Sequence, residues 1–321
     1  MTGICIEKSY TSCIMVGGKE GFMDFSRVQL KDIETFRPYL KKMKFNTCDY
    51  TVGGIFMWRD FFQMEYLVEN DVLYSRLFTV DGDYYNNLPI CDDVDGALIR
   101  LISHLKEQNK PCRFCTIPES YVHHFEKLGN SIGYNVEIRE QVNFFDYLYQ
   151  ASDLTTLKGK KFSGQRNQIN KFLRTYDEWS YDAIDRKDID GIKAFFNAYM
   201  EERNEAKPSE SALEENRMTQ EVLENLESYK MLGGVLRVGS KIAGFSLGEI
   251  VDDTLFVHVE KADRSVVGAY QMLVNQFALK FADESIQFIN REEDMGDEGL
   301  RTAKNAYHPV QLIKKYLVEV K

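Results

Sequence analysis

The chain has 321 residues, of which 44% are hydrophobic and 28% are charged, and its formal net charge at pH 7 is −10. This composition excludes a disordered chain, and the length favours two domains of roughly 150 residues each. No apolar run approaches the roughly 20 residues that a membrane span needs, and the negative charge excludes a general affinity for nucleic acid, although a local basic patch can override it.

The cysteines and the first 22 residues bear on the location of the protein. Six cysteines without regular spacing predict reduced thiols rather than a disulfide framework, and therefore a cytoplasmic protein. Residues 1–22 lack the uninterrupted apolar region and cleavage site of a signal peptide. We expect them to form a poorly ordered extension, with Met23 as the beginning of the folded part.

Hydrophobic periodicity predicts the order of elements in the first half. We expect a helix from Val28, a hairpin with strands at 64–68 and 72–78, a helix at 94–108, a strand at 113–117, a helix at 120–128 and a strand at 134–149.

The second half repeats this order after two helices, near residues 192–199 and 218–226. A meander of strands at 235–238, 242–250 and 255–260 is followed by an amphipathic helix at 268–281, a strand at 286–289, a helix at 298–307 and a strand at 310–320. Two similar halves of the α+β class, each with strands and helices in layers, are therefore predicted.

The third strand of the meander alternates apolar and polar residues, which predicts that His258 and Glu260 share one face. A short loop then leads into the helix that starts at Gly268. The first amides of a helix have no internal partner and the dipole is positive there, so this helix start can bind an anion. An ordinary turn between strand and helix is the competing interpretation.

The segment after the next strand concentrates charge. Asn290, Arg291 and Glu292 end a strand expected in the interior of the sheet, where a charge needs a partner or a function. Asp297 and Glu298 suit the start of the following helix. The spacing of these acids fits no calcium-loop pattern, so no metal site is predicted.

One stretch of this acidic protein is cationic. Between Leu154 and Tyr176 there is no acidic residue, and the basic residues are Lys158, Lys160, Lys161, Arg166, Lys171 and Arg174. Either this is a solvated helix between domains, or it contacts phosphate or an RNA backbone.

Two short motifs are excluded as sites. The sequence from Gly244 to Gly248 matches G-x-S-x-G, but a nucleophile elbow needs a strand, a turn and a helix, and here a strand continues. Cys112 and Cys115 form a C-x-x-C pair without a second pair, so zinc is not expected.

Several of these segments together resemble a bacterial family, the one that shares the C-terminal domain of phosphatidylglycerol lysyltransferase. The similar segments are 157–161, 166–172, 243–249, 258–263, 268–271, 290–296 and 299–301, and the resemblance extends over about residues 24–316. It implies two tandem GNAT-like domains with mixed central sheets, at 23–155 and 156–321, with the site in the second. It also implies a relation to the peptidyltransferases that use aminoacyl-tRNA.

From this resemblance we expect an acyl or aminoacyl transferase with an amine or hydroxyl acceptor. Glu260 or Glu292 would be the base and Arg291 would stabilise the oxyanion or a phosphate. The donor would contact His258, Arg264, Gly268, Ala269, Tyr270 and Asn290, and tRNA would contact Lys160, Lys161, Arg166, Lys171 and Arg174.

The donor itself stays open between aminoacyl-tRNA and acyl-CoA. The pyrophosphate loop of acetyltransferases resembles [RQ]-x-x-G-x-[GA], whereas here Arg264 precedes Gly268 by four residues and Tyr270 stands where a small residue is expected. This departure favours tRNA over coenzyme A. The alternatives are an acetyl-CoA-dependent N-acetyltransferase and a non-catalytic module that binds RNA or a nucleotide.

Overall fold

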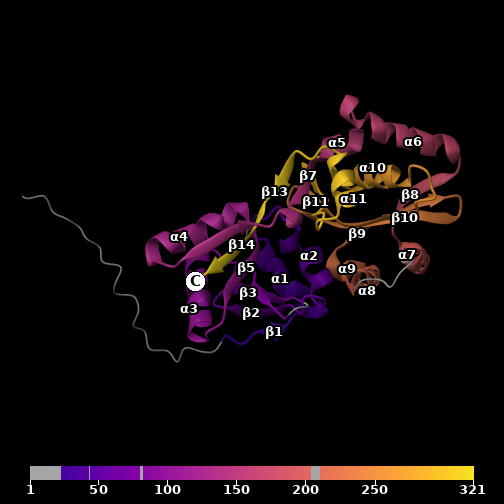
Figure 1. Cartoon of the computed structure of the whole chain (residues 1–321). Helices are drawn as coiled ribbons and strands as arrows, with labels where there is room; N and C mark the ends of the chain where they lie inside the picture. The colour runs from indigo at the N-terminus through magenta and orange to yellow at the C-terminus, as the bar shows by residue number, and fades with distance from the viewer. Residues whose placement is uncertain (1–22, 43, 80–81, 204–209) are drawn as a thin grey trace, which may run out of the picture.

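A computed structural model describes residues 23–321 except 43, 80–81 and 204–209 (Figure 1). The expectation for residues 1–22 therefore falls outside the described residues.

The first half contains the expected hairpin, helices and strands, together with elements that the sequence did not predict. Its elements are β1 (Ser26–Arg27), α1 (Ile33–Leu40), α2 (Val52–Trp58), β2 (Glu65–Glu69), β3 (Val72–Phe78), β4 (Tyr84–Asn86), α3 (Val94–Glu107), β5 (Cys112–Pro118), α4 (Val122–Ile132) and β6 (Val136–Glu140). Side-chain caps fix two helix starts, because Thr51 accepts from the amide of Gly54 and Asp93 accepts from the amide of Gly96.

In the second half the meander and the amphipathic helix are confirmed. Two elements, β7 (Asp146–Gln150) and α5 (Ala151–Thr156), lie at the end of the first half. They are followed by α6 (Ser163–Thr175), β8 (Trp179–Ala183), α7 (Ile189–Arg203), α8 (Glu210–Glu224), α9 (Leu226–Tyr229), β9 (Leu232–Val238), β10 (Lys241–Val251), β11 (Thr254–Ala262), α10 (Ala269–Phe281), β12 (Phe288–Asn290), α11 (Glu298–Asn305), β13 (Gln311–Ile313) and β14 (Lys315–Val320).

The strands form two seven-stranded sheets with the same pairing pattern. The first has the order β1-β2-β3-β4-β5-β14-β6, and the second, counted from its β8 edge, has the order β8-β9-β10-β11-β12-β7-β13. In each sheet the fourth and fifth strands are parallel and the other neighbours are antiparallel. The predicted α+β class with two similar halves and mixed sheets is therefore confirmed.

The two halves exchange one strand each. The sixth strand of the first sheet is β14, from the end of the chain, and the sixth strand of the second sheet is β7, from the first half. The expected single strands at 134–149 and 310–320 were therefore wrong, because each consists of two strands that belong to different sheets. Two strands, β7 and β14, pair with strands on the other side of the boundary expected between residues 155 and 156, so a division into 23–155 and 156–321 does not separate the sheets.

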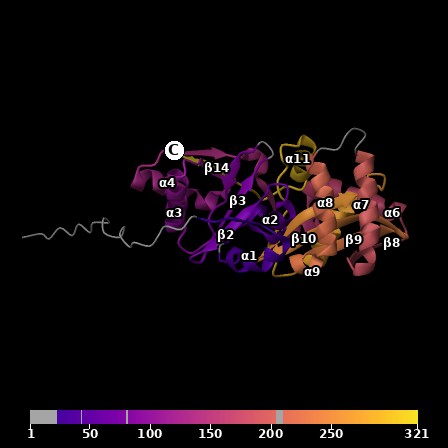
Figure 2. The ribbon, with the colours of Figure 1, turned by 90° about the horizontal axis from the view of Figure 1, so that it is seen from below.

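Helices cover both faces of the second sheet. Figure 1 shows α5, α6 and α10 on one side of it, and Figure 2 shows α7 and α8 across the other. On the α7 side, Phe245, Leu247 and Val259 belong to a core that continues into the first half, whereas Leu255 and Val257 pack with α10. One face of the second sheet thus meets the first half, and the other is enclosed by its own helices.

Candidate functional site

The candidate site lies where the two parallel strands of the second sheet separate. Strands β11 and β12 pair over three residues, ending with Phe256 opposite Asn290. Beyond this pair β11 continues to Ala262 while β12 ends. The carboxyl ends of parallel strands at such a point are where α/β proteins commonly bind ligands.

An ion pair connects the separated strands on the face covered by α10. Arg291 donates from Nε and Nη2 to the same oxygen of Glu260, at 2.9 and 2.6 Å. The guanidinium also lies over the rings of Tyr149 and Tyr307, with 4.9 Å to the second centroid. The third guanidinium nitrogen, Nη1, is buried and has no hydrogen-bond partner among the described residues.

His258 does not share the environment of Glu260, contrary to the prediction from alternation. Leu247 of β10 lies opposite Val259 and the next residue, Gly248, lies opposite Val257, so His258 is the extra residue of a β-bulge in β11. A bulge interrupts the two-residue period, so the side chain turns to the face that meets the first half. There its imidazole fills the space beside Gly53 of α2, where an added Cβ would lie 2.3 Å from the ring.

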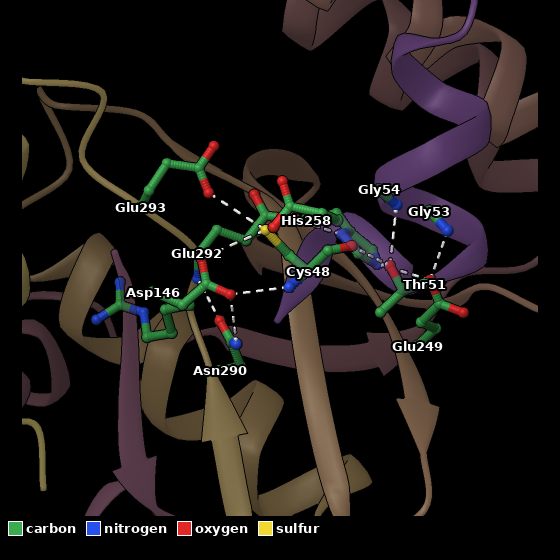
Figure 3. Close-up of polar contacts among 12 residues, drawn as sticks. Cys48, Thr51, Gly53, Gly54, Asp146, Glu249, His258, Asn290, Glu292 and Glu293 are labelled. Atoms are coloured by element: carbon green, nitrogen blue, oxygen red, sulfur yellow. Dashed lines mark hydrogen bonds and ion pairs between the residues drawn. The ribbon is translucent and has the colours of Figure 1, made fainter. Parts of the chain in front are cut away.

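On that face His258 lies between two carboxylates (Figure 3). Its Nδ1 is 2.7 Å from Glu292 and its Nε2 is 3.0 Å from Glu249, which also accepts from the amide of Gly53 at 2.5 Å. Burial alone would lower the pKa of His258, but the hydrogen bonds and charges of the two glutamates raise it to about 10. His258 is therefore an imidazolium at neutral pH that joins the halves.

The loop after β12 is held in an uncommon conformation. Glu292 has a φ of 56°, and its amide donates to the side chain of Asn290 at 2.7 Å. Asn290 is fully buried and also donates to Asp146 at 3.0 Å. From α11, Lys304 donates to the carbonyl oxygens of residues 291, 292 and 293. These contacts fix Arg291 and Glu292 on opposite faces of the sheet.

A second buried cluster of charged side chains, which sequence reasoning missed, lies on and beside the exchanged strands β7 and β14. Lys315 of β14 has no exposed side-chain surface, and its Nζ lies 2.7 Å from Asp146, 2.6 Å from Asp49 and 3.6 Å from Glu293. Cys48 donates its thiol toward Asp146 and Glu293. The signal that could have found this cluster is an acid within the apolar strand β7 and a lysine within the final strand.

Three residues of this cluster have the ligand types of a metal site. The ligand atoms of Cys48, Asp49 and Asp146 lie within 4.8 Å of one another. The ammonium of Lys315 already supplies the positive charge there, at hydrogen-bond distance from all three of them. Burial raises the pKa of Asp49 to about 6 against the opposing charge of Lys315.

The predicted anion site at Gly268 meets another helix. Gly268 has a φ of 77°, and a Cβ there would lie 2.4 Å from the carbonyl oxygen of Gln168 in α6. Ala269 is buried, the hydroxyl of Tyr270 is 3.0 Å from that of Tyr199, and Arg264 is exposed. The close approach that glycine permits here is therefore made by α6, and donor binding at this helix start stays a prediction.

The cationic stretch forms α6 and the turn before it. Lys160, Lys171 and Arg174 are exposed, Lys161 pairs with Asp153 at 2.7 Å, and Arg166 donates to the carbonyl oxygen of Gly159 at 2.7 Å. Part of the charge thus stabilises the preceding turn, and part faces outward. Ser246 of the G-x-S-x-G match lies within β10, where the chain continues as a strand instead of turning into a helix.

Among the described residues, no helix is both long enough and apolar enough to cross a bilayer.

Comparisons with known proteins agree with this architecture. Residues 40–319 match the family described as phosphatidylglycerol lysyltransferase, C-terminal. A conserved protein of unknown function from Bacteroides thetaiotaomicron has a similar structure, with a TM-score of 0.85 and 30% identity over 93% of this chain and 100% of that one. The L-PGS of Bacillus licheniformis has a TM-score of 0.61 with 13% identity over 89% of this chain and 91% of that one, which shows the shared fold alone.

FemX also has a similar fold, with a TM-score of 0.58 and 8% identity over 93% of this chain and 98% of that one. An uncharacterised protein of Mycoplasmoides gallisepticum is 26% identical over 188 residues, which are 58% of this chain and 59% of that protein. The predicted tandem GNAT-like fold is confirmed by these matches and by the paired sheets. Because the family match extends over residues 40–319, the chain belongs to the family of the phosphatidylglycerol lysyltransferase C-terminal domain.

Proposed function

We propose that the protein transfers an aminoacyl group from tRNA to an amine or hydroxyl acceptor, at the gap between β11 and β12. The observation that carries the proposal is the guanidinium of Arg291. It is fixed by Glu260 and has one buried nitrogen without a hydrogen-bond partner among the residues that the structure describes. A preorganised donor of this kind stabilises the negative charge that develops on a carbonyl oxygen under attack.

The transfer uses Glu260 and Arg291 together. The acceptor's nitrogen or oxygen attacks the carbonyl carbon of the aminoacyl ester, while Arg291 Nη1 donates to the carbonyl oxygen. Glu260 takes the acceptor's proton on Oε1, because both hydrogen bonds from Arg291 go to Oε2. The ester bond to the ribose then breaks, and the proton passes to the leaving ribose oxygen.

Glu292 is the second candidate for the base. Burial raises its pKa above the ordinary value of a glutamate, although the hydrogen bond from His258 opposes this rise. Its Oε1 is already engaged by His258 on the other face of the sheet. We therefore place Glu260 first and use the two variants to separate them.

Two features support tRNA as the donor. The outward cations of α6 form a local basic face on an otherwise acidic protein, and the family contains the phosphatidylglycerol lysyltransferases. Coenzyme A is disfavoured because α6 contacts the helix start at Gly268, where a GNAT pyrophosphate would bind. The non-catalytic alternative keeps the same basic face and lacks only the transfer step.

The test measures release of labelled amino acids from a mixture of charged tRNAs, with glycinamide as a simple amine acceptor. Glu260→Gln should lower the rate by about 100-fold or more, and Arg291→Lys should lower it by about 100-fold. Glu292→Gln should have the smaller effect. The control is Glu65→Gln, because Glu65 accepts from Arg76 Nε and Nη2 at 2.8 and 2.6 Å in the first sheet.

Each alternative function predicts a different experimental outcome. Binding of tRNA without release of amino acid would identify a non-catalytic module. Thermal stabilisation by acetyl-CoA and not by charged tRNA would overturn the proposed donor. Equal rates for wild type, Glu260→Gln and Arg291→Lys would remove this site from the reaction.

A further inference from the structure

A row of buried hydrogen-bonding groups without partners crosses the second sheet beside Glu260. Within the described part of the chain, four such atoms belong to this row: the hydroxyls of Tyr181, Ser246 and Tyr307, and Nη1 of Arg291. Ser246 is fully buried and Tyr307 is 6% exposed. These groups come from β8, from β10, from the loop after β12 and from the turn after α11.

Strand register places them side by side. Ser246 of β10 lies opposite Glu260 on one neighbouring strand and opposite Gly234 on the other. From the edge strand β8, Tyr181 extends over Gly234, where a Cβ would be 2.0 Å from its hydroxyl. Since neighbouring strands are about 4.8 Å apart, the Tyr181 and Ser246 hydroxyls lie one to two strand spacings from the carboxylate of Glu260.

The other end of the row reaches α6. Arg291 lies over the ring of Tyr307, which directly follows Ala306. Gln165 of α6 donates to the carbonyl oxygen of Ala306 at 2.6 Å, and its own Oε1 is also buried without a partner among the described residues. The helix that carries the basic face therefore covers this end of the row.

Buried polar groups of this kind destabilise the folded protein unless a hydrogen-bond partner is present. Each buried donor or acceptor without a partner loses its hydration without compensation, so native proteins satisfy nearly all of them with protein, water or ligand. Burial raises the pKa of Tyr181 and Tyr307, and an interaction with the hydroxyl of Ser246 opposes the rise at Tyr181, so both hydroxyls keep their protons. The row therefore offers three hydroxyls and one guanidinium nitrogen to a polar ligand.

We propose that the Tyr181 and Ser246 end of this row binds the side chain of the transferred amino acid, and that this side chain is uncharged and hydrogen-bonding. The inference rests on the proposed function, since Arg291 Nη1 then holds the carbonyl oxygen of the same aminoacyl group. A side chain with a hydroxyl or an amide can both donate to and accept from the two hydroxyls.

A charged side chain fits this end poorly. An ammonium would need a carboxylate, and the one that faces this row, Glu260, is already paired with Arg291. An aliphatic side chain would leave both hydroxyls without a partner other than each other. Sites that bind a ligand through hydrogen bonds reject apolar analogues strongly for this reason. The site thus favours an amino acid whose side chain forms hydrogen bonds with the hydroxyls of Tyr181 and Ser246.

The test measures the dissociation constants of amino-acid amides by calorimetry, using serinamide, threoninamide and glutaminamide against leucinamide and lysinamide. At least one of the first three should bind about tenfold or more tightly than the last two. Ser246→Ala and Tyr181→Phe should each weaken that binding by about two- to tenfold. Both variants should leave the melting temperature close to that of wild type, because among the described residues the two hydroxyls have no hydrogen-bonding side chain other than each other.

The matched control is Tyr50→Phe, since the buried hydroxyl of Tyr50 accepts from the amide of Leu88 at 3.2 Å. It should lower the melting temperature and leave amide binding unchanged. A falling melting temperature in Ser246→Ala and Tyr181→Phe, with unchanged binding, would make their hydroxyls structural and overturn the inference. Preference for leucinamide or lysinamide, or no binding of any amide, would also overturn it.

The proposed function can survive that failure. Release of amino acids from tRNA that depends on Arg291, but is indifferent to Ser246→Ala and Tyr181→Phe, refutes only the selection of the side chain. Loss of all release in wild type refutes the function, and the amide titrations then decide separately whether the row binds a ligand.

Discussion

The charge on His258 should make the stability of this protein depend on alkaline pH. Its pKa is raised from 6.5 to about 10 in the folded protein by hydrogen bonds and charges from Glu249 and Glu292 that outweigh burial. A raised pKa means that the folded state holds the proton more tightly than the unfolded chain. The resulting stabilisation is complete below about pH 6.5 and is lost as the pH rises through about 10.

The magnitude follows from the shift. The full shift corresponds to about 5 kcal/mol, and linkage places about 2.5 kcal/mol of the loss between pH 7 and pH 9. Replacement by glutamine leaves two carboxylates without a cation, so His258→Gln should be destabilised by about 3–5 kcal/mol at pH 7. The difference between wild type and variant should shrink by about 2.5 kcal/mol at pH 9.

Urea unfolding at the two pH values measures this difference. The comparison with the variant cancels the titration of other groups, and His308→Gln serves as the control because His308 is exposed. The free energy of unfolding of this control should change between pH 7 and pH 9 by the same amount as that of wild type. A difference between wild type and His258→Gln that is the same at pH 7 and pH 9 would refute the assignment of a charged imidazole.

Three further substitutions test the packing around the site by urea unfolding. Lys315→Met should cost about 3–5 kcal/mol, because three carboxylates lose their buried cation, and part of this loss should return at pH 5; no recovery would contradict the cluster. Gly53→Ala should be strongly destabilising because its Cβ would meet the ring of His258, whereas Gly164→Ala, in open space on α6, should stabilise by up to about 1 kcal/mol. Gly268→Ala should cost about 1–3 kcal/mol, through its positive φ and its contact with α6; a neutral result would remove that contact.

The amino-acid sequence determined most of the local elements. The stripe of apolar residues on α10 predicted this helix, and the meander with its turns predicted β9, β10 and β11, to within a few residues. Local periodicity records which side of an element is buried, and that information is present in a short window of sequence. The repeated order of elements likewise indicated two similar halves, and the residues of the 290–296 segment carried the resemblance to the family.

Tertiary structure alone decided which strands pair and what each polar side chain contacts. Alternation within 134–149 and 310–320 does not reveal that each segment serves two sheets, because the partner strands are far away in sequence. The bulge that turns His258 away from Glu260 depends on register with β10, and Gly268 accommodates α6 rather than open space. The ion pair of Lys315 with Asp146 exists only because both lie on exchanged strands, so burial of these charges could not be foreseen from either segment alone.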